Sequence, residues 1–121
     1  MKLIKLFVVL IVIIITYYSL RLPGDESLPT NDKVGHFLAY AALSFNVILL
    51  CKTFKQKWLG IFSAIGYGLL MEFCQGLVPG RDPSFYDMLA NSTGVFIGFL
   101  FAKLFGNWFL RFISKVFPSL K

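Results

Sequence analysis

Long apolar runs, interrupted only by short polar stretches, are the feature that most limits how this chain can fold. Each run is close in length to the roughly 20 residues that an α-helix needs to cross a bilayer. Of the 121 residues, 57% are hydrophobic and 15% are charged, whereas soluble domains carry about 25% charged residues. These values predict an integral membrane protein with one small bundle and no room for a second domain.

The expected fold is all-α, an integral membrane four-helix bundle with an amphipathic C-terminal helical tail. A cleaved signal peptide is the alternative for the first run, but no small-x-small cleavage pattern follows it. Tyr17 and Tyr18 instead suit the interfacial anchors of a retained helix. We expect membrane spans at about 4–21, 34–51, 58–78 and 88–104.

Beyond the fourth run, polar residues recur at helical spacing and aromatic residues fill the positions between them. The polar members are Lys103, Asn107, Arg111, Ser114 and Lys115. Such a tail should either extend the last span or lie in the membrane surface, with Gly106 as the point of a bend.

Basic residues are divided unevenly between the two ends of the predicted bundle. Nine of them and no acid fall on one side, namely Lys2, Lys5, Lys52, Lys55, Lys57, Lys103, Arg111, Lys115 and Lys121. The other side carries three basic residues and most of the acids. The positive-inside rule therefore predicts a multi-pass protein of the bacterial cytoplasmic membrane with both termini in the cytoplasm.

Several classes of site and partner are not indicated by the sequence. Cys51 and Cys74 are expected at different depths, too far apart for a disulfide. No Cys/His spacing typical of zinc occurs, and the basic residues form no nucleic-acid motif. We expect no cofactor, no metal site and no nucleic-acid partner.

The stretch from Glu72 to Asp87 combines buried polar groups with a Pro-Gly turn. Glu72 lies six residues before Val78, about 9 Å below the outer end of its span. His36 and Asn91 are each about one turn inside the outer ends of their spans. Three runs thus each place a polar group at a similar depth near the outer end of the bundle, which predicts a shared polar pocket.

Helical spacing extends this pocket to further residues. The candidate pocket residues are Asp32, His36, Tyr40, Glu72, Gln75, Arg81, Ser84, Asp87 and Asn91. Gly68, Gly76, Gly94 and Gly98 are candidates for close helix packing. We expect the third and fourth spans to pack tightly together, with the second laid against them.

Each candidate also has a structural explanation. Glu72 could simply lock the bundle through a hydrogen bond or ion pair. Ser84 or Asp87 could cap the fourth helix. Arg81 could be solvated, although its planar fork suits a phosphate or carboxylate.

The combined pattern of these motifs resembles the VanZ-like membrane proteins. The matching motifs are Asp32-Lys33-Val34-Gly35-His36-Phe37-Leu38-Ala39-Tyr40, Glu72-x-x-Gln75 and Pro79-Gly80-Arg81-x-x-Ser84-x-x-Asp87-x-x-x-Asn91-x-x-Gly94-x-x-x-Gly98. The resemblance implies a four-span bacterial inner-membrane protein, and the founding member of the family lowers susceptibility to the glycopeptide teicoplanin. The family has no securely assigned reaction, so the resemblance supplies no mechanism.

The first functional hypothesis is a cell-envelope protein that binds or modulates an anionic component, such as a cell-wall precursor or membrane lipid, at this pocket. The alternative is a membrane-embedded enzyme that acts on a lipid or lipid-linked head group through His36, Glu72 and Asp87. Those three residues could also hold a divalent metal, but no recognised motif supports it. A transport role has less support because inverted repeats are not visible, and the oligomeric state is left open.

Overall fold

The computed structural model describes residues 2–20, 32–79 and 85–120, and all regular secondary structure in these ranges is helical. The elements are α1 (Lys2–Leu20), α2 (Asp32–Leu50), α3 (Phe54–Gln75), α4 (Phe85–Val116) and a short 3-10 helix, η1 (Pro118–Leu120). The all-α prediction is confirmed. Asp32 and Lys33 belong to α2, but their side chains are not described.

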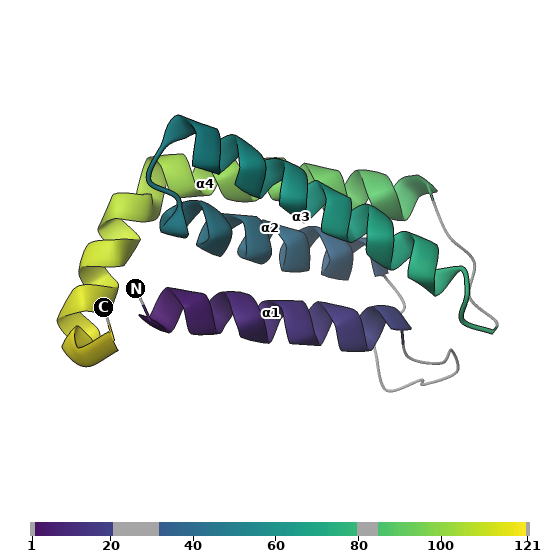
Figure 1. Ribbon diagram of the computed structural model, residues 1–121, viewed down its shortest axis with the longest axis horizontal. Coiled ribbons are helices and arrows are strands. Elements are labelled where there is room, and N and C mark those ends of the chain that lie inside the picture. The colour runs from purple at the N-terminus through teal and green to yellow at the C-terminus, as the bar shows by residue number, and fades with distance from the viewer. Residues whose placement is uncertain (1, 21–31, 80–84, 121) are drawn as a thin grey trace.

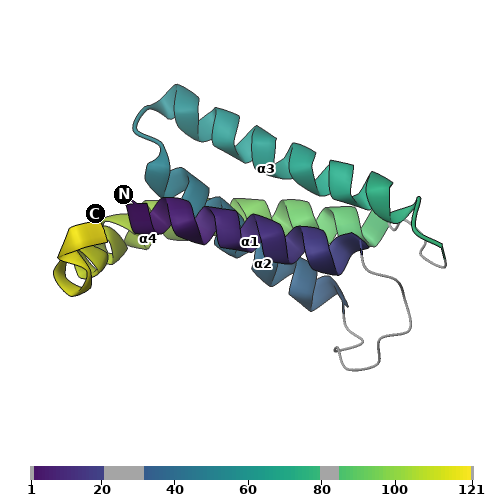
Figure 2. The ribbon, with the colours of Figure 1, turned by 60° about the horizontal axis from the view of Figure 1, so that its bottom comes forward.

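The first three helices and most of α4 lie side by side and alternate in direction (Figures 1 and 2). Helices α1 and α3 end, and α2 and α4 begin, at one end of the bundle, and the short α2–α3 turn lies at the other end. Residues near the end of α1, the start of α2, the end of α3 and the start of α4 therefore come to the same end of the bundle.

Helices α2 and α4 form the most extensive contact in the molecule. A Cβ atom at Gly94 would lie 2.4 Å from the carbonyl oxygen of Phe37, and one at Gly98 would lie 2.2 Å from that of Ala41. The two backbones are thus in direct contact, and the Ser44 hydroxyl adds a 2.7 Å hydrogen bond to the Val95 carbonyl. The expectation that α3 and α4 would be the tightly packed pair is wrong, because the small-residue stripe of α4 faces α2.

The start of α3 is set by a capping box. The Thr53 hydroxyl accepts a 3.1 Å hydrogen bond from the Gln56 backbone N–H, and the Gln56 side chain accepts from the backbone N–H of Thr53. This arrangement satisfies N–H groups that a helix terminus otherwise leaves unpaired. The helix therefore begins at Phe54, four residues before the predicted span.

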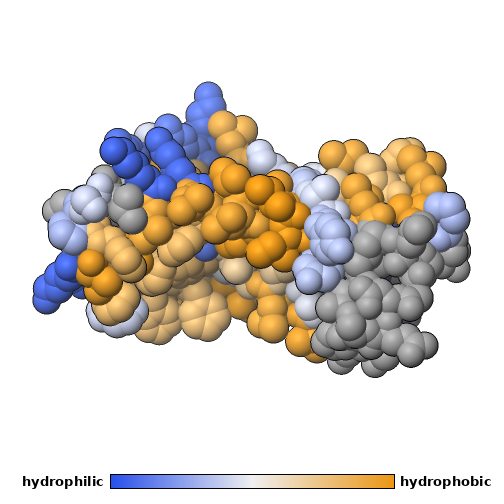
Figure 3. Space-filling model, turned by 90° about the horizontal axis from the view of Figure 1, so that it is seen from below, coloured by the Kyte–Doolittle hydropathy of each residue, from blue (hydrophilic) through white to orange (hydrophobic). Residues whose placement is uncertain are grey.

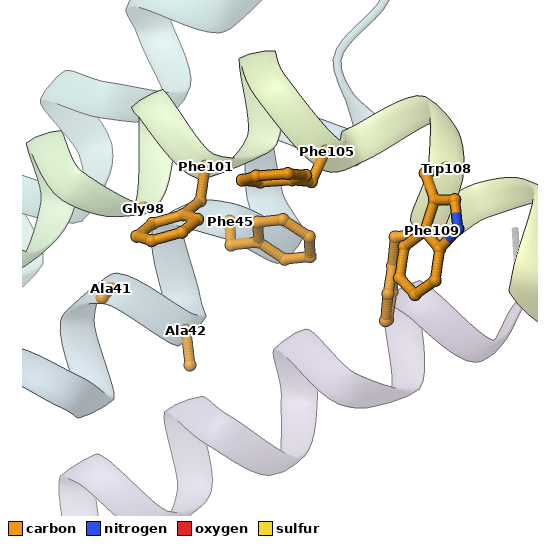
Figure 4. Close-up of a pocket in the computed structure, with 8 residues that line it drawn as sticks. All are labelled: Ala41, Ala42, Phe45, Gly98, Phe101, Phe105, Trp108 and Phe109. Atoms are coloured by element: carbon orange, nitrogen blue, oxygen red, sulfur yellow. The ribbon is translucent and has the colours of Figure 1, made fainter.

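Helix α4 continues through the predicted amphipathic tail without interruption to Val116. Its C-terminal part turns away from the other helices and lies near the start of α1 (Figures 1 and 2). The change of direction falls between Phe105 and Trp108 (Figure 4), the interval that contains Gly106. Gly106 is buried, and a Cβ there would meet the end of the Leu49 side chain at 2.8 Å.

The outside of the molecule is largely apolar. Large hydrophobic side chains on every long helix are exposed, and Figure 3 shows them covering the middle of one face, with hydrophilic residues gathered toward the end that holds the termini. Helices α1 and α4 are long and apolar enough to cross a membrane by length and composition. The apolar part of α2, Val34–Leu50, is shorter, and α3 does not meet the same criterion. The four-span topology therefore stays a prediction.

The close α2–α4 contact predicts a position-dependent response to added methyl groups. Gly98→Ala should lower the free energy of unfolding by about 1 to 3 kcal/mol, because the new Cβ collides with backbone that cannot move aside cheaply. Gly66→Ala is the matched control, since no described atom lies within 4 Å of a Cβ there. It should raise stability by about 0.5 to 1 kcal/mol through helix propensity. Reversible denaturation of the purified variants followed by circular dichroism measures both, and equal effects would contradict the contact.

Candidate functional site

Glu72 is the most deeply buried charged side chain among the described residues, with 2% of its surface exposed. It lies near the end of α3, one turn after the buried Gly68. A Cβ at Gly68 would lie 3.2 Å from Cε1 of Tyr40 and 3.3 Å from Nδ2 of Asn91. The absence of a side chain at Gly68 thus lets α2 and α4 bring Tyr40 and Asn91 against α3, directly beside the turn that carries Glu72.

His36 and Asn91 join α2 to α4 near the same end of the bundle. Nδ1 of His36 lies 2.8 Å from Oδ1 of Asn91. Since an amide oxygen only accepts hydrogen bonds, this assignment places the histidine proton on Nδ1 and leaves Nε2 as an acceptor in the neutral ring. Asn91 is buried and His36 is half-buried, so Asn91 fixes the orientation of an imidazole that is not fully enclosed.

Tyr67 attaches α1 to this group. Its hydroxyl is hydrogen-bonded with the Thr16 hydroxyl and donates to the Val12 carbonyl at 3.2 Å. Its ring centroid lies 6.1 Å from that of Tyr40. Sequence reasoning did not select Thr16 or Tyr67, although Thr16 lies one turn inside the end of α1, the same criterion that selected His36 and Asn91.

The Tyr40 side chain lies close to both Gly68 and Tyr67. Tyr40 is 1% exposed, and the Tyr67 and Glu72 side chains are both close enough to interact with it electrostatically. No hydrogen-bond partner for this hydroxyl occurs in the part of the chain that the structure describes. We use the term polar cluster for Thr16, His36, Tyr40, Tyr67, Glu72 and Asn91, which together come from all four long helices.

The remaining candidate residues are placed less completely. Gln75 is buried on α3, one turn beyond Glu72, and Asp87 is half-buried in the first turn of α4. Gly76 is exposed and forms the C-cap of α3. Asp32 begins α2, but its side chain is not described. Arg81 and Ser84 lie outside the described residues.

The polar cluster offers proton-exchanging and hydrogen-bonding groups within a largely apolar core. Buried polar groups of this kind are strongly coupled, because a group that loses its partner has no water to replace it. Among the described residues, no three His, Cys, Asp or Glu side chains are grouped so that they could hold a metal ion. Both cysteines are free. The arrangement is suited to orienting His36 and Glu72 at one end of the bundle.

The attachment of α1 through Tyr67 can be tested directly. Tyr67→Phe should lower the free energy of unfolding by about 0.5 to 1.5 kcal/mol, because it removes the hydroxyl that joins α3 to Thr16 and Val12. Tyr17→Phe is the matched control, since Tyr17 is exposed on α1 and its change should be close to neutral. A Tyr67→Phe variant as stable as this control would show that the hydroxyl contributes nothing to holding α1.

Residues 5–106 match the family model described as VanZ/LLP1. No curated protein and no solved structure matched the chain. The family match spans all four long helices up to the change of direction in α4, and it includes every residue of the polar cluster. The protein therefore belongs to the VanZ/LLP1 family.

Proposed function

We propose that the protein is a multi-pass membrane protein of the bacterial cell envelope, with all four long helices in the cytoplasmic membrane. The exposed apolar surface of these helices and the hydropathy of α1 and α4 support this placement. The excess of basic residues at the end that holds the termini supports a cytoplasmic location for that end. The polar cluster then lies toward the outer leaflet.

The function of the outward end is to bind an anionic group of an envelope component, such as a cell-wall precursor or a lipid head group. The observation that carries this proposal is the burial of Glu72 close to Tyr40 and one turn from Gly68, where Asn91, the hydrogen-bond partner of His36, approaches α3. An ionisable side chain at membrane depth costs at least about 2.5 kcal/mol to insert, so a purely structural bundle has little reason to include one.

The ligand would be recognised by cationic and hydrogen-bonding groups at the same end of the chain's helices as Glu72. When its ring carries both protons, His36, held by Asn91 through Nδ1, would donate from Nε2. Arg81 would supply a planar fork that can form two parallel bonds with a phosphate or carboxylate. Glu72 and Asp87 would attract and orient these cations, so that loss of a carboxylate would displace the groups that hold the ligand. In a cell, occupation of this site would alter access of teicoplanin to its target and thereby lower susceptibility to the drug.

Glu72→Gln tests the carboxylate while retaining the size and the hydrogen-bonding capacity of the side chain. We expect the variant to reach the membrane in normal amounts and to lose the protection that the wild-type chain gives against teicoplanin, measured as the minimal inhibitory concentration in a susceptible host. Glu26→Gln makes the same chemical change in the segment between α1 and α2 and should leave the protection unchanged. Normal amounts of Glu72→Gln with full protection would contradict the proposal.

If Glu72→Gln fails to accumulate, the carboxylate is required for folding and Arg81 decides the question. Arg81→Ala should abolish protection because it removes the cation, and Arg81→Lys should restore it only in part, because an ammonium lacks the planar fork. Full protection by Arg81→Ala at normal protein levels would refute anion binding. Turnover of a lipid-linked substrate by the purified protein, lost in Glu72→Gln, would instead identify an enzyme.

A further inference from the structure

An apolar groove of about 320 Å³ lies between α2 and α4, along the half of the bundle that leads to the termini (Figure 4). Its floor is formed by Ala41, Ala42 and Gly98, where the two helices are in backbone contact and no large side chain fills the space. Ala42 is exposed, so the groove opens to the outside of the molecule.

Aromatic side chains form the sides of the groove. Phe101 and Phe105 stack on one another along α4, with ring centroids 5.8 Å apart. Phe45 of α2 meets Phe109 edge-to-face at 5.2 Å. A space lined in this way offers no polar partners to hold ordered water, since each buried water needs two to four of them. The groove is therefore suited to a flexible hydrocarbon chain.

The far end of the groove is marked by Trp108, at the point where α4 changes direction (Figure 4). Tryptophan is enriched at the boundary between hydrocarbon and head groups. Arg111 and Lys115 follow Trp108 by three and seven residues, so the three residues lie along one side of the helix. Both basic residues are exposed. Cationic groups thus stand where the head group of a lipid in the groove would emerge.

We propose that this groove binds an anionic phospholipid of the cytoplasmic leaflet, with one acyl chain between α2 and α4 and the head group at Arg111 and Lys115. The cytoplasmic leaflet is rich in anionic lipids that basic residues attract at this depth. The inference rests on the membrane placement proposed above but is independent of the polar cluster, which lies toward the other end of the bundle.

Two single-tryptophan variants of the full chain test the proposal. Trp58→Phe leaves Trp108 in the groove as the reporter, and Trp108→Phe leaves Trp58, which is exposed on the first turns of α3. Each variant is reconstituted in phosphatidylcholine vesicles that contain increasing fractions of brominated phosphatidylglycerol or brominated phosphatidylcholine, whose bromines quench tryptophan fluorescence on contact. For each basic residue that contacts the head group, the fraction of brominated phosphatidylglycerol that quenches half of the Trp108 fluorescence should be about fivefold lower than the fraction of brominated phosphatidylcholine that does so. Trp58 lies beside Lys55 and Lys57 but does not line the groove, so it should show a weaker preference for the anionic lipid than Trp108.

Two further changes in the Trp58→Phe background test the acyl-chain site and the head-group site separately. Ala42→Phe fills the open floor of the groove and should abolish the preferential quenching, whereas Val9→Phe adds the same ring to an exposed position on α1 and should not. Replacing Arg111 and Lys115 together by Gln should remove the preference for phosphatidylglycerol and leave quenching by phosphatidylcholine unchanged.

The outcomes distinguish failure of this inference from failure of the membrane placement. Quenching of both reporters to the same extent by both lipids would place the protein in the bilayer and refute the lipid site. Quenching of neither reporter, even in vesicles made entirely of brominated lipid, would refute the membrane placement itself. Preferential quenching that persists in Ala42→Phe would show that the acyl chain does not lie in the groove.

Discussion

The direct backbone contact between α2 and α4 is the constraint on which the rest of the structure depends. Gly94 and Gly98 remove the side chains that would hold the two helices apart, and the Phe37 and Ala41 carbonyls occupy the vacated positions. In a lipid environment, where apolar burial gives helices little reason to associate, such close packing is a main source of attraction. The same closeness brings His36 within hydrogen-bond distance of Asn91 and leaves the shallow space beside Ala42.

Helix α3 is held to this pair in a different way. Gly68 allows a close approach at one point, and the Tyr67 hydroxyl connects the helix to α1. Each of these contacts lies within five residues of Glu72. These two contacts lie near Glu72, so substitutions there will affect both stability and the chemistry of the site. Controls for folding are for this reason essential to any test of Glu72.

The sequence was sufficient to predict the helices, because hydropathy and the Pro-Gly interruptions mark them independently of tertiary structure. It also indicated that His36, Glu72 and Asn91 occur at similar depth. It did not reveal which helix faces the glycines of α4, because a small-x-x-x-small pattern identifies a surface for close approach but not the partner.

Thr16 and Tyr67 were missed since hydroxyl groups in apolar helices usually bond to their own backbone, as Thr16 also does. The early start of α3 was readable from Thr53 and Gln56, whose spacing is that of a capping box.

In the membrane placement proposed above, that capping box has a consequence for how the protein would fit its bilayer. Because Thr53 and Gln56 satisfy backbone groups at the start of α3, the three-residue turn after α2 depends less on hydration than an uncapped helix end would. In that placement the turn could lie below the head groups in a thicker bilayer and closer to the water in a thinner one. Lys52 and Lys55 have long aliphatic stems that can extend to the aqueous phase from either depth.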